Sequence, residues 1–183
     1  APLTLPQPVN AYRAGNGAPG PDYWQNEADY VMHAVLDAKD KILRNDEVIT
    51  YTNNSPLKMN FIWMQLDQNL FRQDSRGSAI IPIGGSRNGG HGQIFDAGDK
   101  IKSVKILSGP NNTVATDAKY LINDTRMQIF LPKELNANGG VLKVKIEYSF
   151  ISPDYGSDRM WIMQTKNGKI FTIAQWYPRM CVF

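Results

Sequence analysis

Histidine, cysteine and paired carboxylates are the side chains with which a protein most often binds zinc or catalyses hydrolysis, and this chain has few of them. It contains two histidines, His33 and His91, and one cysteine, Cys181. Neither histidine is followed by Glu and a second His at helical spacing, so the His-Glu-x-x-His zinc motif is missing. One cysteine allows no internal disulfide and no cysteine pair for zinc. We therefore expect neither a catalytic residue nor a metal site in this chain.

Two other stretches could carry chemistry, and both have simpler interpretations. The glycine-rich stretch Gly84–Gly92 lacks the Gly-Lys-Ser/Thr of a phosphate-binding loop, so we interpret it as a surface loop in which His91 is at most a weak ligand. Glu147, Asp154 and Asp158 could act as an acid–base or calcium set. Asp154 follows a proline and precedes Tyr-Gly, which favours a turn.

We expect His33, which falls in a β run, to be a half-buried strand residue.

The tryptophans allow two interpretations. The chain has four, and tryptophan can form a sugar-stacking platform when exposed or anchor a core when buried. Core anchors are the simpler expectation for a β protein, and exposed tryptophans would favour a binding module. The residues are Trp24, Trp63, Trp161 and Trp176.

Composition narrows the class of protein further. The 183 residues carry 20 Lys and Arg against 17 Asp and Glu, with both signs mixed along the chain, which argues against a nucleic-acid partner. No apolar run reaches the roughly 18 residues that span a bilayer. The chain begins at Ala1 without an initiator methionine, as it would after removal of a signal peptide or in a cloned fragment. We expect an exported protein.

The elements that must position these residues follow a period of two rather than a helical period. Residues 1–22 are rich in Pro and Gly and predict an extended arm or linker. From Tyr23 onward, alternating apolar residues predict short strands, with a turn at 37–40, a short helix near 69–71 and an Asn-Gly hairpin at 166–169. The sequence predicts an all-β, mostly antiparallel fold with little helix, as saddle-like or sandwiched sheets. The expected strands are 30–36, 42–53, 61–66 (buried on both faces), 101–107, 119–122, 125–131, 142–150, 161–165 and 170–176.

Three stretches of the chain resemble a known family. They are Tyr23–Tyr30, then Glu47–Pro56 continuing to Trp63–Asn69, and lastly Ile170–Met180, which reads IFTIAQWYPRM and is the most specific. In this order and spacing they resemble the N-terminal domain of zinc aminopeptidases of the aminopeptidase N family, gluzincin metallopeptidases, in their Bacteroidetes-like form. The resemblance covers Tyr23 to Phe183.

The resemblance implies a fold, a partner and a role. It implies a β-saddle domain, 23–183, that packs on a catalytic domain of the same parent chain, and that domain would supply zinc and the peptidase chemistry. It also implies that Gln175, followed by Arg179, lies in the element that binds the free α-amino group of peptide substrates. Relatives continue with further strands after this segment, so the resemblance implies a domain truncated at its C-terminal end.

Two expectations remain beside this one. The alternative function is a free-standing β-sandwich module that binds carbohydrate or protein. Separately, the apolar and aromatic stretch Ile170–Phe183 predicts self-association of the fragment as a homodimer, because an uncovered strand edge and apolar surface favour pairing with a second copy.

Overall fold

The computed structural model describes residues 10–77, 96–154 and 160–182. These residues form a five-stranded sheet in the order β1-β2-β8-β4-β5, a four-stranded sheet in the order β11-β3-β7-β6, and a separate hairpin of β9 and β10. All strand pairs are antiparallel. The expected all-β antiparallel fold is therefore confirmed. None of the helices among the described residues is long and apolar enough to cross a membrane.

Four of the five strands in the larger sheet are long, and β5 is short. The members of this sheet are β1 (Glu27–Asp37), β2 (Ile42–Asn53), β8 (Gly140–Ile151), β4 (Lys100–Ser108) and β5 (Val114–Asp117). The four-stranded sheet contains β3 (Met59–Gln65), β7 (Arg126–Leu135), β6 (Lys119–Asn123) and the two-residue edge strand β11 (Arg179–Met180). The hairpin is β9 (Met160–Thr165) and β10 (Gly168–Ile173), and two short 3₁₀ helices are η1 (Asp67–Phe71) and η2 (Pro110–Asn112).

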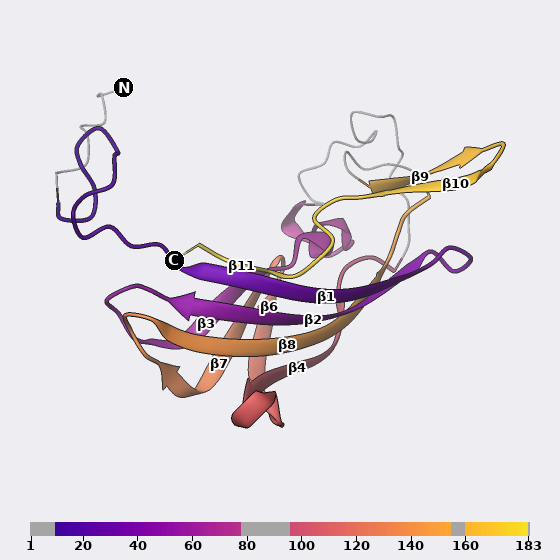
Figure 1. The fold of residues 1–183 in the computed structure, drawn as a ribbon. Helices are drawn as coiled ribbons and strands as arrows, with labels where there is room; N and C mark the ends of the chain where they lie inside the picture. Colours follow the sequence, from indigo (N-terminus) through magenta and orange to yellow (C-terminus); the bar gives the residue numbers. More distant parts are fainter. Residues whose placement is uncertain (1–9, 78–95, 155–159, 183) are drawn as a thin grey trace.

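The core lies between the two sheets because each contributes one apolar face. Along β8 every second residue from Leu142 to Phe150 is buried, while the lysines between them point outward. Facing residues from the four-stranded sheet, among them Met64 and Ile129, are fully buried in the same cluster. Figure 1 shows β3, β6 and β7 running beneath the long strands of the larger sheet.

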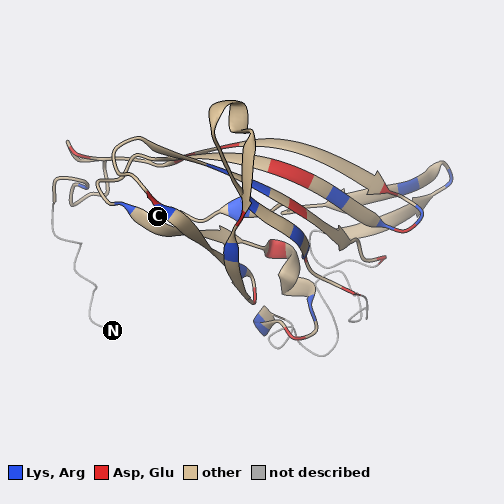
Figure 2. Ribbon diagram, turned by 90° about the horizontal axis from the view of Figure 1, so that it is seen from below, with Lys and Arg blue, Asp and Glu red and all other residues tan. Residues whose placement is uncertain are grey.

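The outer face of the five-stranded sheet is charged. Lys145 lies 3.8 Å from Asp46 and 3.6 Å from Glu147, and Lys102 lies 2.9 Å from Glu147. Figure 2 shows Lys and Arg interspersed with Asp and Glu along the long strands. Exposed pairs of this kind contribute little to stability, about 0–1 kcal/mol each, and they mark a solvated face.

Two expectations about burial are wrong. Residues 61–66 are not buried on both faces, because Phe61 and Trp63 lie on the outer side of β3 with 38% and 41% of their surface exposed. His33 is not half-buried, since its side chain on the edge strand β1 is 74% exposed and lies 3.6 Å from Asp46. A central strand buries both faces only when a layer covers each, and no described element covers this side of β3.

The turns at one end of the sandwich are joined by a buried asparagine. Asn53, the last residue of β2, is fully buried, and its Nδ2 donates to the carbonyls of Leu57 and Asn136 at 2.8 and 2.9 Å. Its Oδ1 accepts from the Ser55 hydroxyl at 2.6 Å. One side chain thus ties the β2–β3 turn to the turn between β7 and β8.

Candidate functional site

The segment from Ala174 to Pro178 connects the β9–β10 hairpin to the edge strand β11, and it contains Gln175. This glutamine has φ of 51°, in the left-handed region that residues with a Cβ seldom occupy. Its side chain is exposed and makes no hydrogen bond within the part of the chain that the structure describes. A backbone conformation of this kind costs free energy and persists only where its surroundings impose it.

The constraint on Gln175 comes from a buried side chain of η1. Gln68 is 2% exposed, and its Nε2 donates to the carbonyls of Ala174 and Gln175 at 3.1 and 2.9 Å. Two bonds from one amide nitrogen fix the direction of the backbone at this point. The side chain of Gln175 is thereby held outward, with its amide oxygen available as an acceptor.

Arg179 is committed to a partner inside the chain. Its Nε donates to Asp67 Oδ2 at 2.8 Å and its Nη2 to Oδ1 at 3.3 Å. The hydrogen bond to Asp67 raises the pKa of the guanidinium further above its already high value. Arg179 therefore joins β11 to the start of η1, the helix that also carries Gln68, and it stabilises the segment rather than extending toward a ligand.

Two aromatic residues of the segment pack on tyrosines of the larger sheet. The ring of Tyr177 lies 5.4 Å from those of both Tyr30 and Trp176, in edge-to-face arrangements. The hydroxyl of Tyr148 donates to the carbonyl of Trp176 at 3.2 Å, and the hydroxyl of Tyr30 accepts from the backbone N–H of Met180 at 2.8 Å. The segment is thus fastened at both ends and at its centre.

Behind these tyrosines lies a cluster of buried acceptors that sequence reasoning missed. Glu47 of β2 is fully buried, and neither of its carboxylate oxygens has a hydrogen-bond partner among the described residues. Within the same part of the chain, Oδ1 of Asp99 (7% exposed) and Oδ1 of Asn45 (5% exposed) also have no partner, while Nδ2 of Asn45 donates to Tyr148. Burial, reinforced by the charge of Asp99, raises the pKa of Glu47 to about 8. Burial, reinforced by Asp67, raises the pKa of Asp99 to about 7.

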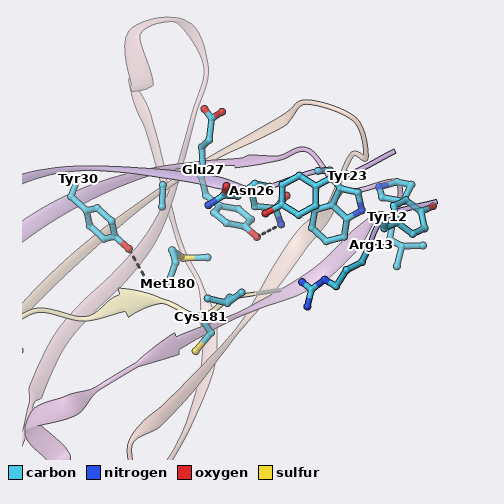
Figure 3. A pocket seen from close by; sticks show the side chains of 15 residues that line it. Tyr12, Arg13, Tyr23, Asn26, Glu27, Tyr30, Met180 and Cys181 are labelled. Carbon is cyan, nitrogen blue, oxygen red and sulfur yellow. Dashed lines mark hydrogen bonds between the residues drawn. The ribbon is translucent and has the colours of Figure 1, made fainter. Parts of the chain in front are cut away.

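A cavity of about 600 Å³ opens on the other side of Tyr30 (Figure 3). The N-terminal stretch that precedes β1 forms one wall, with Tyr23 and Trp24, and Met180 and Cys181 lie on the opposite side. Asn26 donates to the hydroxyl of Tyr51 at 2.7 Å within it. Gln175 does not line this cavity, so the two features are separate.

No set of three or more His, Cys, Asp or Glu residues is placed to hold a metal ion among the residues that the structure describes. The described residues of this chain therefore offer no ligand set for zinc, which the family resemblance assigns to a separate catalytic domain. Asp154 is paired with Lys41, and Glu147 is paired with Lys102. His91, Asp158 and the stretch Gly84–Gly92 lie outside the described residues.

Comparisons with known proteins yield structural neighbours and no sequence relatives. No protein-family model matches the sequence, and no curated protein matches it either. An M1 zinc metallopeptidase of Deinococcus radiodurans bound to a Tyr-Ser-Ala substrate is similar with a TM-score of 0.45 and 12% identity, over 75% of this chain and 24% of that one. A two-domain M1 zinc metallopeptidase bound to L-tryptophan has a TM-score of 0.44 and 12% identity, over 78% of this chain and 24% of that one. The chain thus spans about a quarter of the length of these structures.

Proposed function

We propose that this chain is the non-catalytic N-terminal domain of a zinc aminopeptidase, and that Gln175 helps to bind the free α-amino group of peptide substrates. The observation that supports this role most directly is the conformation of Gln175, left-handed and anchored through its carbonyl by the buried Gln68. An exposed glutamine with no binding role would gain nothing from a strained backbone. The sequence stretch in which it lies is also the one that most resembles the aminopeptidase N family.

The proposed chemistry divides between domains. A catalytic domain elsewhere in the parent would supply zinc, which activates water for attack on the peptide carbonyl. The amide oxygen of Gln175 accepts a charge-assisted hydrogen bond from the substrate ammonium. Holding that ammonium at a fixed distance from the zinc limits cleavage to the first peptide bond. Arg179, occupied with Asp67, keeps the segment in place.

In the complete peptidase that contains this domain, Gln175→Ala is expected to reduce kcat/KM on amino-acid anilides about 10- to 150-fold, because a hydrogen bond to a charged group contributes about 1.5–3 kcal/mol. Zinc content should be unchanged. Gln175→Glu keeps an acceptor and adds a charge, so it should retain activity.

Gln164→Ala is the matched control. Gln164 is an exposed glutamine of the neighbouring strand β9, and its loss should leave kcat/KM unchanged. Wild-type efficiency in the Gln175→Ala enzyme would show that the proposed role is wrong.

A binding module remains the second candidate, because one observation favours it. Trp63 and Phe61 pack edge to face at 6.3 Å on the outer side of β3, and Phe130, opposite Phe61 in the sheet register, is 38% exposed. Exposed aromatic rings on a sheet face suit stacking against sugar rings.

If the chain is a peptidase domain, as we propose, it should migrate without retardation in native gels that contain soluble polysaccharides such as xylan, glucomannan or laminarin. Retardation that Trp63→Ala abolishes, and that Val141→Ala on the other sheet preserves, would favour the module instead. Val141 is a suitable control because it is apolar, 58% exposed and distant in the register from β3.

A further inference from the structure

The buried carboxyl cluster and the Gln175 segment are in contact through shared tyrosines. Tyr148 donates to the carbonyl of Trp176 and interacts electrostatically with Glu47 and Asp99. Tyr30 packs against Tyr177 and interacts with Glu47. We propose that Ala174–Pro178 is a cover over the carboxyl groups of Glu47 and Asp99, seated while they hold their protons and released when they lose them.

The hydrogen-bonding inventory of the cluster supports the protonated state. Four atoms of the cluster are buried without a partner among the described residues, namely both oxygens of Glu47, Oδ1 of Asp99 and Oδ1 of Asn45, and all of them can only accept when the carboxylates are ionised. Buried polar groups in folded proteins are nearly always paired. Protons on the two carboxyl groups provide the donors that the described side chains do not offer. When those protons leave, the cluster holds unpaired negative charge in an apolar setting, which is costly.

No described cation relieves that charge. The basic residue that follows the covering segment is Arg179 of β11, and it is paired with Asp67. The negative charge of Asp67 in turn raises the pKa of Asp99. The other described titratable groups that interact with Glu47 or Asp99 are two tyrosines whose pKa values are raised by burial, Tyr30 of β1 and Tyr148 of β8.

Hydration of the ionised cluster requires a surrounding element to move, and the segment is held less strongly than the paired strands. Glu47 lies within β2, which is paired along its whole length with β8 and almost as fully with β1. The segment 174–178 is held by side chains, through the Gln68 amide and the Tyr148 hydroxyl, and by β11, which makes two residue pairs. Elements with few backbone hydrogen bonds open first. Release of the segment is therefore the local way for water to reach Glu47.

The pH range of this release follows from linkage. The carboxyl of Glu47 titrates near its ordinary 4.5 when hydrated and at about 8 when covered. Between these values, opening releases one proton from Glu47, and below about pH 7 it releases a second from Asp99. The opening constant therefore rises at least tenfold per pH unit and levels off above pH 8. This inference does not depend on the proposed function, since it concerns the chain's own amides and no substrate.

Hydrogen–deuterium exchange of this chain, followed by mass spectrometry from pH 5 to pH 8 and corrected for the intrinsic rate, tests the inference. In the wild-type chain, peptides covering 174–182 are expected to lose protection at least tenfold per pH unit beyond that correction. Peptides from the paired regions of β2 and β8 should stay more protected at every pH. In Glu47→Gln, which keeps the shape and cannot ionise, the pH response of 174–182 should be clearly weaker than in the wild-type chain and should level off near pH 7, because only Asp99 remains to ionise.

Two outcomes would overturn the proposal. One is the same pH response of 174–182 in the wild-type chain and in Glu47→Gln. The other is a loss of protection shared equally by 174–182, β2 and β8, because global unfolding rather than a cover would then respond to pH. Asp99→Asn is the second variant. It should weaken the pH response without abolishing it, and it allows the comparison if Glu47→Gln does not fold.

Discussion

Glu47→Gln is expected to stabilise the folded chain by about 4 kcal/mol more at pH 8 than at pH 4, since one pKa unit corresponds to about 1.36 kcal/mol. The cause is the burial of a carboxyl group whose pKa rises from 4.5 to about 8 on folding. Urea unfolding followed by tryptophan fluorescence at several pH values measures the difference. It is a large fraction of the stability of an ordinary domain, about 5–15 kcal/mol.

The sign follows from the direction of the pKa shift. A group whose pKa is raised in the folded state contributes its full stability below the unfolded value, here 4.5, and loses it as pH rises to about 8. The wild-type chain should therefore lose stability on going from pH 4 to pH 8, and Glu47→Gln should remove most of that loss. Glu134→Gln, at an exposed carboxylate 3.8 Å from Lys58, is the control and should leave the pH profile unchanged. Parallel profiles for the wild-type chain and Glu47→Gln would disprove the buried-acid assignment.

Asn53→Asp should destabilise the chain by about 3–5 kcal/mol at pH 7, because it leaves an unpaired charge in a buried site. The substitution keeps the shape of the side chain but replaces the donor Nδ2 by an oxygen. That oxygen would then face the carbonyls of Leu57 and Asn136, which in the wild-type chain accept from Nδ2 at 2.8 and 2.9 Å. The urea midpoint of the purified variant gives the loss directly.

Asn54→Asp provides a matched comparison one residue away. Asn54 donates from its side chain to the carbonyl of Gln25 at an exposed position, so its replacement should cost less than about 1 kcal/mol. If Asn53→Asp costs as little stability as Asn54→Asp, the turn tolerates a charge and Asn53 does not tie the two turns together.

Much of the fold could be predicted because the strands alternate cleanly. The expected strand 42–53 coincides with β2, and the alternation expected for 142–150 is the observed burial pattern of β8. The Asn-Gly hairpin at 166–169 also lies where its turn residues predicted it. The short strand β5 was missed because Val114–Asp117 is exposed throughout and leaves no periodic signal.

The candidate site was harder to predict, for two physical reasons. The left-handed backbone of Gln175 depends on Gln68, which is remote in sequence, and no local pattern encodes it. Glu47 could have been found, since the alternation that turns Ile49 and Tyr51 inward turns Glu47 inward too. A charged residue in a strand is normally expected on the solvent-facing side. Only the alternation along the whole strand places Glu47 on the buried face. The domain boundary at residue 23, the homodimer and the exported location stay predictions.

The order of strands in the larger sheet has a consequence for how the chain folds. Strand β2 pairs with β1, its neighbour in sequence, and on its other side with β8, from which five of the described strands and two short helices separate it in the chain. The β1–β2 hairpin can form as soon as both strands leave the ribosome, but the other edge of β2 gains its partner only after β8 has been made. Distant pairings of this kind slow folding and prolong the exposure of apolar surface. The nascent chain is therefore most exposed to aggregation during the synthesis of β3 to β7.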